Sequence, residues 1–166
     1  MMNHVKCLII KSFRRIRIMA ITTFKSDVKW SGEGVLSKAQ MNQHEVLIDE
    51  PESLGGKDQG ANPVEYILAA LGGCINVLVT SFAEQFDVQV DDVHVHLEGD
   101  LDPDGFLGKN PDVRPGYEEI RYEVTIDSPS AQEKIDALLA HVDKVCPVKD
   151  TLTGTNVVNQ KSVSAK

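Results

Sequence analysis

Two cysteines, Cys74 and Cys146, are the residues of this chain best suited to chemistry. Cys74 follows two glycines in an apolar stretch, and Cys146 is followed directly by Pro147. A thiolate is a nucleophile and a metal ligand, whereas a buried free cysteine often serves only as a small apolar side chain. The chain has no C-x-x-C motif, so neither a thioredoxin-type site nor a zinc ribbon is indicated. His141 and Cys146 could ligate a metal only with partners from elsewhere. The spacing alone leaves a reactive pair and two buried apolar residues both open.

The stretch before Cys74 predicts the start of a helix at Asn62 and Pro63. Asparagine suits the N-cap, because its side-chain oxygen accepts from a free backbone N–H of the first turn. Proline suits the first helical position, where its missing N–H costs nothing. Glu65 falls three residues after the cap and can accept from the N–H of Asn62. We therefore expect a capped helix that runs from about Pro63 to Phe86.

This helix is expected to be the buried centre of the domain. Residues 67–79 are apolar except for Asn76, and a helix that is apolar on every face is buried. The run is shorter than the roughly 20 residues that span a bilayer. Gly72 and Gly73, with two nearby alanines, make one side thin. That side suits close packing against another helix, exposure of the Cys74 sulfur to a pocket, or both.

The remaining pattern groups strands and helices rather than alternating them, which predicts an α+β fold. Residues 21–50 indicate a meander of two or three antiparallel strands that includes residues 21–24, followed by a glycine-rich loop. Residues 88–98 and 118–127 alternate with period two and predict a hairpin, with His94 and His96 on its solvated side. An amphipathic helix is expected between Ser128 and Cys146, then a turn or short helix at residues 150–154, then a final strand.

Composition indicates one globular domain over residues 21–166. The chain has 166 residues, of which 42% are apolar and 25% charged, and a net charge of −8 that argues against nucleic acid as a partner. No membrane partner is expected. Three cysteines fit a reducing cytoplasm better than secretion. Residues 1–20 form a basic extension without acidic residues, which we interpret as lying outside the native domain or as disordered.

The segments around both cysteines resemble the OsmC/Ohr family. Residues 62–74 read NPVEYILAALGGC, and residues 145–152 read VCPVKDTL. Leu54-Gly55-Gly56 adds to the similarity, which covers roughly residues 24–160 and is closer to the OsmC-like branch. The resemblance implies an intertwined homodimer in which sheets flank two long central helices and the active sites lie at the subunit interface.

The resemblance also implies thiol-dependent reduction of organic hydroperoxides. Cys74 matches the cysteine that attacks the peroxide, and Cys146 matches the one that resolves the product to a disulfide. A small or lipoyl-type dithiol would then reduce the pair. The expected partners are a second copy of the chain, a hydroperoxide and this dithiol, with no metal or other cofactor. The alternative is a protein of the same fold that binds a small molecule or acts in stress with little peroxidase activity.

Two positions depart from the family pattern. Family peroxidases place a glutamate ten residues before the attacking cysteine, where this chain has Val64; Glu65 is nine residues before it. Glu65 is therefore both a catalytic candidate and a helix cap. The family also uses an arginine of the N-terminal sheet to hold the thiolate, and this chain has no arginine between Ile18 and Val113. Lys29, Lys38 and Arg114 are the remaining candidate cations, whereas Arg121 is expected to pair with Glu119 or Glu123.

Overall fold

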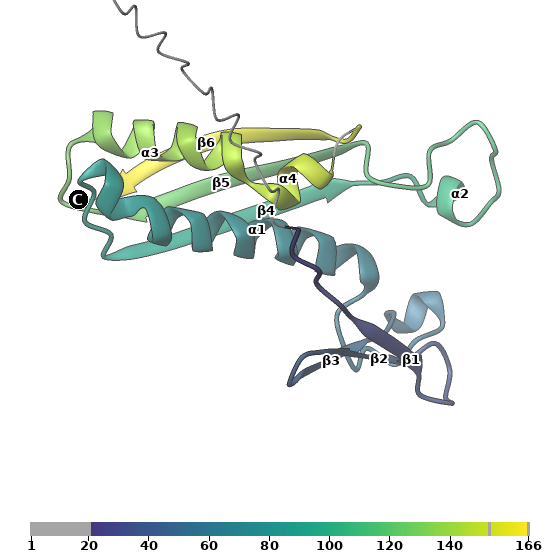
Figure 1. Ribbon diagram of the computed structural model, residues 1–166. Helices are drawn as coiled ribbons and strands as arrows, with labels where there is room; N and C mark the ends of the chain where they lie inside the picture. Colours follow the sequence, from purple (N-terminus) through teal and green to yellow (C-terminus); the bar gives the residue numbers. More distant parts are fainter. Residues whose placement is uncertain (1–20, 153, 166) are drawn as a thin grey trace, which may run out of the picture.

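The computed structural model describes residues 21–152 and 154–165, so the predicted extension at residues 1–20 lies outside the described part. The fold is α+β, as predicted, and consists of two three-stranded sheets and a long helix that connects them (Figure 1). Its elements in chain order are β1 (Asp27–Trp30), β2 (Ser37–Met41), β3 (His44–Ile48), η1 (Glu52–Leu54), α1 (Pro63–Phe82), η2 (Ala83–Phe86), β4 (Asp92–Asp100), α2 (Pro103–Phe106), β5 (Glu119–Asp127), α3 (Gln132–Val145), α4 (Pro147–Thr151) and β6 (Asn156–Ala165).

The N-terminal sheet is the predicted antiparallel meander, in the order β1-β2-β3. It stands apart from the other sheet and is joined to it through the start of α1 (Figure 1). Residues 21–24 were expected to extend the meander, and this prediction is wrong: they form no strand and are exposed. Every residue of β1 is exposed as well, including Trp30. What separates the two is pairing: β1 pairs with β2, whereas residues 21–24 pair with no strand among the described residues, so their β-branched and aromatic residues alone do not make a strand.

The C-terminal sheet carries the core. The expected hairpin is present as β4 and β5, and β6 then pairs with β5 in parallel. Alternate residues of β5 face the helices and are buried, whereas His94 and His96 lie on the exposed side of β4, as predicted. Helices α1 and α3 pack beside each other on this sheet. The buried β5 residues are Ile120, Tyr122, Val124 and Ile126.

Helix α1 begins as predicted. The side chain of Asn62 accepts from the N–H of Glu65 at 2.9 Å, and the carboxylate of Glu65 accepts from the N–H of Asn62 at 2.9 Å. These two hydrogen bonds complete a capping box, which satisfies two otherwise free N–H groups. The helix continues through η2, so the predicted end at Phe86 is close to the observed one.

The prediction that α1 is buried on every face is wrong for the single chain. Leu71, Ile75 and Val79 are buried against the sheet and α3, but Ile67 and Val77 are exposed. The two glycines also point in different directions. A Cβ on Gly72 would lie 2.7 Å from Cδ1 of Leu97, whereas a Cβ on Gly73 would have no neighbour within 4 Å.

By length and composition alone, the continuous helix Pro63–Phe86 could cross a membrane. It has 24 residues, and an 18-residue stretch of it has a mean hydropathy of 1.8, so the apolar part extends beyond residues 67–79. The same features occur in the core helix of a globular domain. Because α1 packs against β4, α3 and α4, the core accounts for part of its apolar character, namely the 28% of that 18-residue stretch that is buried.

Candidate active site

Proline places Cys146 between two helices. A proline disfavours helical geometry in the residue before it, and Cys146 is extended, with φ −69° and ψ 109°. Pro147 then opens α4 at the first helical position, where its missing N–H costs nothing. Cys146 thereby becomes the N-cap of α4, and its Sγ accepts from the N–H of Lys149 at 3.4 Å.

Cys74 lies in the middle of α1 and reaches the same point from the other side. Its Sγ is 3.2 Å from the Sγ of Cys146. Both cysteines are free thiols; Cys74 is half-buried and Cys146 is 3% exposed. A disulfide bond is about 2.05 Å long, so closing one needs a movement of only about 1 Å. The structure therefore brings together the two cysteines that the sequence singled out.

Burial is the main influence on the Cys74 thiol and raises its pKa, because a thiolate is poorly solvated there. The backbone N–H of Val148, in the first turn of α4, acts in the opposite direction and lowers this pKa. Contact with Cys146 raises it, and the net pKa is above the ordinary value. Cys74 itself is in mid-helix, so this N–H comes from the first turn of α4 and not from the start of α1.

A polar cluster from three elements borders Cys146. The hydroxyl of Tyr122, on β5, donates to Oδ1 of Asp143, on α3, at 2.7 Å. The ammonium of Lys149, on α4, pairs with the same oxygen and lies 5.8 Å from the centre of the Tyr122 ring. Burial raises the pKa of Tyr122, and its hydrogen bond to Asp143 raises it further. Burial alone would raise the pKa of Asp143, but Lys149 and Tyr122 hold it below its ordinary value.

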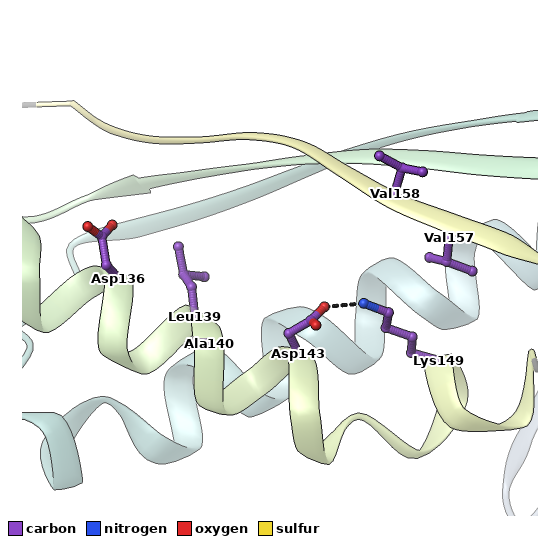
Figure 2. Close-up of a pocket in the computed structure, with 7 residues that line it drawn as sticks. All are labelled: Asp136, Leu139, Ala140, Asp143, Lys149, Val157 and Val158. Atoms are coloured by element: carbon purple, nitrogen blue, oxygen red, sulfur yellow. Dashed lines mark hydrogen bonds and ion pairs between the residues drawn. The ribbon is translucent and has the colours of Figure 1, made fainter.

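A groove of about 530 Å³ runs between α3 and β6 beside this cluster. Figure 2 shows Asp143 and Lys149 joined as an ion pair on its helix side, with Asp136 further along α3 and Val157 and Val158 on the strand. A narrow cavity behind the groove is lined by residues that include Tyr122, Asp143, Cys146 and Lys149. The ion pair therefore lies between the groove and the buried sulfur.

Three of the cations considered from the sequence, Arg114, Arg121 and Lys38, are engaged elsewhere. Arg114 donates to the carbonyl of Gly154 at 2.5 Å and to Oγ1 of Thr155 at 3.0 Å. Arg121 pairs with Glu119, as expected, and not with Glu123; its other partners are Asp100 and Glu98. Lys38 pairs with Glu45 at 3.5 Å. Among the described residues, none of these cations shifts the pKa of Cys74.

The structure places Glu65 in the capping box of α1, where its carboxylate accepts from Asn62. Among the described residues, no hydrogen bond links it to either cysteine. His141 packs between two aromatic rings, with its ring centre 4.6 Å from that of Phe82 and 5.3 Å from that of Phe86. Of the predicted site residues, the two cysteines are thus brought together, and Glu65 serves the start of the helix.

Tyr122, Asp143 and Lys149 were missed as site residues. Lys149 had a usable signal, because a Cys-Pro pair predicts an N-cap and places the third residue after the cysteine in the first turn of the next helix. Tyr122 and Asp143 had no local signal. The position of Tyr122 on a core strand predicts a buried side chain, and the position of Asp143 on an amphipathic helix predicts an exposed one. Neither position predicts the hydrogen bond between them.

The fold and the paired thiols define a class of cysteine-containing α+β proteins with a long central helix. A family model for OsmC-like proteins matches residues 56–161. The chain therefore belongs to the OsmC-like family, as the sequence resemblance indicated. No curated protein matches the chain.

Solved structures support the same fold. An OsmC-like protein from Mycoplasma pneumoniae has a TM-score of 0.73 at 18% identity, over 86% of this chain and 98% of that one. The organic hydroperoxide resistance protein OsmC from Legionella pneumophila has a TM-score of 0.63 at 21% identity, over 88% and 99%. An organic hydroperoxide resistance protein from Elizabethkingia anophelis has a TM-score of 0.65 at 16% identity, over 90% and 100%. At these identities the similarity establishes the fold.

Proposed function

We propose that this protein reduces organic hydroperoxides with its two cysteines. The observation that carries the proposal is the 3.2 Å separation of the Cys74 and Cys146 sulfurs, since a thiol pair at this distance can close to a disulfide after one sulfur is oxidised. Membership of a family that includes organic hydroperoxide resistance proteins supports a peroxide as the oxidant.

Exposure supports the assignment of roles. Cys74 is half-buried, so a peroxide can reach its sulfur, whereas Cys146 is buried. The Cys74 thiolate would attack the O–O bond, which releases an alcohol after protonation and leaves a sulfenic acid on Cys74. The Cys146 thiol would then attack the sulfenic sulfur, and water would leave. A dithiol, of lipoyl or similar type, would reduce the disulfide by exchange and become a disulfide itself.

This chemistry is complete without a metal or flavin. We propose that Glu65 contributes by fixing the start of α1 rather than by contacting the peroxide, because its carboxylate is occupied in the cap. The chain would act in the cytoplasm, where reducing conditions keep both thiols free, and as a single domain over residues 21–166.

A homodimer is part of the proposal. The side of α1 that faces away from the sheet exposes Ile67 and Val77, and the separate N-terminal sheet exposes Val28 and Trp30. A second chain that packed on both regions would bury them and complete the all-round burial expected of α1. Light scattering after size exclusion would give twice the chain mass, and Val77→Asp would give the single-chain mass. A wild-type protein that is monomeric at high concentration would contradict this proposal.

Counting thiols tests the peroxidase function. One equivalent of cumene hydroperoxide added to reduced protein should remove two thiols from the wild type. Cys74→Ser should remove none at the same peroxide concentration, and Cys146→Ser should form a sulfenic acid that dimedone traps on Cys74. If all thiols of the wild type survive a tenfold excess, the peroxidase proposal is wrong.

One observation favours a second candidate, a protein of this fold that binds a small molecule with little turnover. The pKa of Cys74 is raised by burial, and among the described residues no arginine or lysine lowers it. Since the thiolate is the reactive form, such a thiol is slow at neutral pH. Equilibrium binding of cumyl alcohol without loss of thiols on exposure to the hydroperoxide would support this candidate.

A further inference from the structure

Three side chains from three elements meet at one carboxylate oxygen beside the sulfur pair. Oδ1 of Asp143 accepts from the Tyr122 hydroxyl at 2.7 Å and pairs with the Lys149 ammonium. Tyr122 is buried in the sheet, and Lys149 lies in the first turn of α4. The carboxylate therefore ties α4 to β5 and α3. We name these three residues the carboxylate clamp.

The first turn of α4 also determines the position of Cys146. The N–H of Lys149 donates to the Sγ of Cys146 at 3.4 Å, and this Sγ is 3.2 Å from that of Cys74. Lys149 thus contacts Asp143 through its side chain and the Sγ of Cys146 through its backbone N–H. α4 has only five residues, so besides the packing of Val148 and Leu152 against the core the clamp is its main polar anchor to β5 and α3. Loss of the clamp would allow α4 and Cys146 to move away from Cys74.

We propose that Asp143, with Tyr122 and Lys149, is a positioning residue that holds Cys146 against Cys74 and thereby sets the rate of disulfide formation. The clamp does not touch the oxidant. In the step that it controls, the Cys146 thiol loses its proton, its sulfur bonds to the oxidised sulfur of Cys74, and the group on that sulfur leaves. Reactions between positioned groups are sensitive to displacements of about 1 Å.

The proposal rests on the proposed function for its natural oxidant, but the positioning itself can be tested without peroxide. Diamide adds to one thiol across its N=N bond, and a second thiol then displaces the hydrazine to form the disulfide. This second step depends on how Cys146 is placed and not on peroxide chemistry. The diamide experiment can therefore contradict the role of the clamp whether or not the protein reduces peroxides.

The main variant is Lys149→Met, which removes the ion pair from a partly exposed side chain and keeps the backbone N–H that contacts Cys146. Asp143→Ala removes both contacts of the clamp. Lys149→Arg is the conservative variant, because a guanidinium can still pair with Asp143. Asp136→Ala is the matched control: Asp136 lies two turns earlier on α3, and its carboxylate accepts from Gln132 at 2.8 Å.

Disulfide formation after diamide addition is followed by mass spectrometry of the Cys74 and Cys146 peptides. We expect Lys149→Met and Asp143→Ala to slow the closing step by about tenfold or more, and Lys149→Arg and Asp136→Ala to leave it within about twofold. Rates within twofold of wild type in both Lys149→Met and Asp143→Ala would overturn the proposal. So would equal slowing in Asp136→Ala.

With cumene hydroperoxide the clamp variants should slow disulfide closure more than formation of the Cys74 sulfenic acid, because Cys146 takes part in closure and affects the first step only through the pKa of Cys74. The slower closure then leaves the sulfenic acid open to a second peroxide, so a larger share of Cys74 should be recovered as sulfinic acid. A merely structural defect would lower both steps together and would not change this ratio. An unchanged ratio alongside unchanged diamide kinetics would overturn the role of the clamp.

Discussion

The two faces of α1 differ in what the single chain provides for them. One face is complete: Leu71, Ile75 and Val79 pack against the sheet and α3, and Gly72 admits Leu97. The other face has exposed Ile67, an open Gly73 and Val77, which is 63% exposed. Cys74 lies between these faces. The difference teaches that the side of Cys74 toward the sheet is built within one chain, whereas its other side borders a surface that this chain leaves exposed.

The largest effect is expected from Leu71→Ala on the inner face. Removing a fully buried leucine side chain should lower the free energy of unfolding by about 2–5 kcal/mol, because the sheet cannot close over the cavity. Urea denaturation measures this loss, which should not depend on protein concentration.

Val77→Ala is the matched change on the outer face. In dilute protein it should alter the free energy of unfolding by about 0.5 kcal/mol or less. At concentrations that favour a dimer, its cost should grow, since a partner would bury this side chain. If Leu71→Ala and Val77→Ala lose equal free energy of unfolding in dilute monomer, the two faces of α1 do not differ.

The pH dependence of the reactivity of Cys74, which lies between the two faces of α1, tests whether a cation acts on its thiol. Burial raises the pKa of its thiol above the ordinary value, so the thiolate fraction at neutral pH is small. The rate of alkylation by iodoacetamide should rise by about tenfold for each pH unit below the pKa, and it should still be rising at pH 8.5. Peptide mass spectrometry follows the modification of Cys74.

A plateau below pH 7.5 would contradict this prediction and indicate a cation near the thiolate. Comparison of dilute and concentrated protein locates such a cation. A plateau that appears only in concentrated protein would place it on a partner chain across the outer face. The variant Cys146→Ser provides the control, because it removes the contact that raises the pKa of Cys74.

The adjacent glycines are expected to respond differently to the same substitution. Gly73→Ala should stabilise the dilute chain by about 1 kcal/mol, because alanine favours the helix and its Cβ meets open space. In Gly72→Ala the new Cβ would lie 2.7 Å from Cδ1 of Leu97. Gly72→Ala should therefore gain less stability than Gly73→Ala, because the end of the Leu97 side chain has to move aside. Thermal unfolding compares the two variants. If Gly73→Ala destabilises the protein only at high protein concentration, a partner helix packs at this point.

Local signals predicted most of the fold. The start of α1 follows from Asn62, Pro63 and Glu65, which satisfy one another's hydrogen bonds within one turn. The β4–β5 hairpin and the buried stripe of α3 follow from periodicity, because a two-residue or 3.6-residue repeat directly specifies which side chains face the core. These features depend on residues close together in the chain.

The features that sequence reasoning missed depend on residues far apart. The open outer face of α1 could not be predicted, because an apolar side chain has the same sequence signal whether its own chain or a partner covers it. The N–H of Val148 near Cys74 and the meeting of Tyr122 with Asp143 arise only when α4 and β5 pack beside α1 and α3. The exposed residues 21–24 show the same limit, since β propensity needs a neighbour to become a strand.

The smallest effect is expected from Glu65→Gln. The glutamine oxygen can still accept from the N–H of Asn62, so the cap should persist and the rate of cumene hydroperoxide consumption should change by less than about twofold. Asn62→Ala should instead lower the free energy of unfolding by about 1 kcal/mol without changing this rate. Peroxide assays and urea denaturation on both variants separate the cap from a chemical role. If Glu65→Gln loses more than about tenfold in rate at unchanged stability, the carboxylate acts in the reaction, and the N-terminus of α1 belongs to the active site.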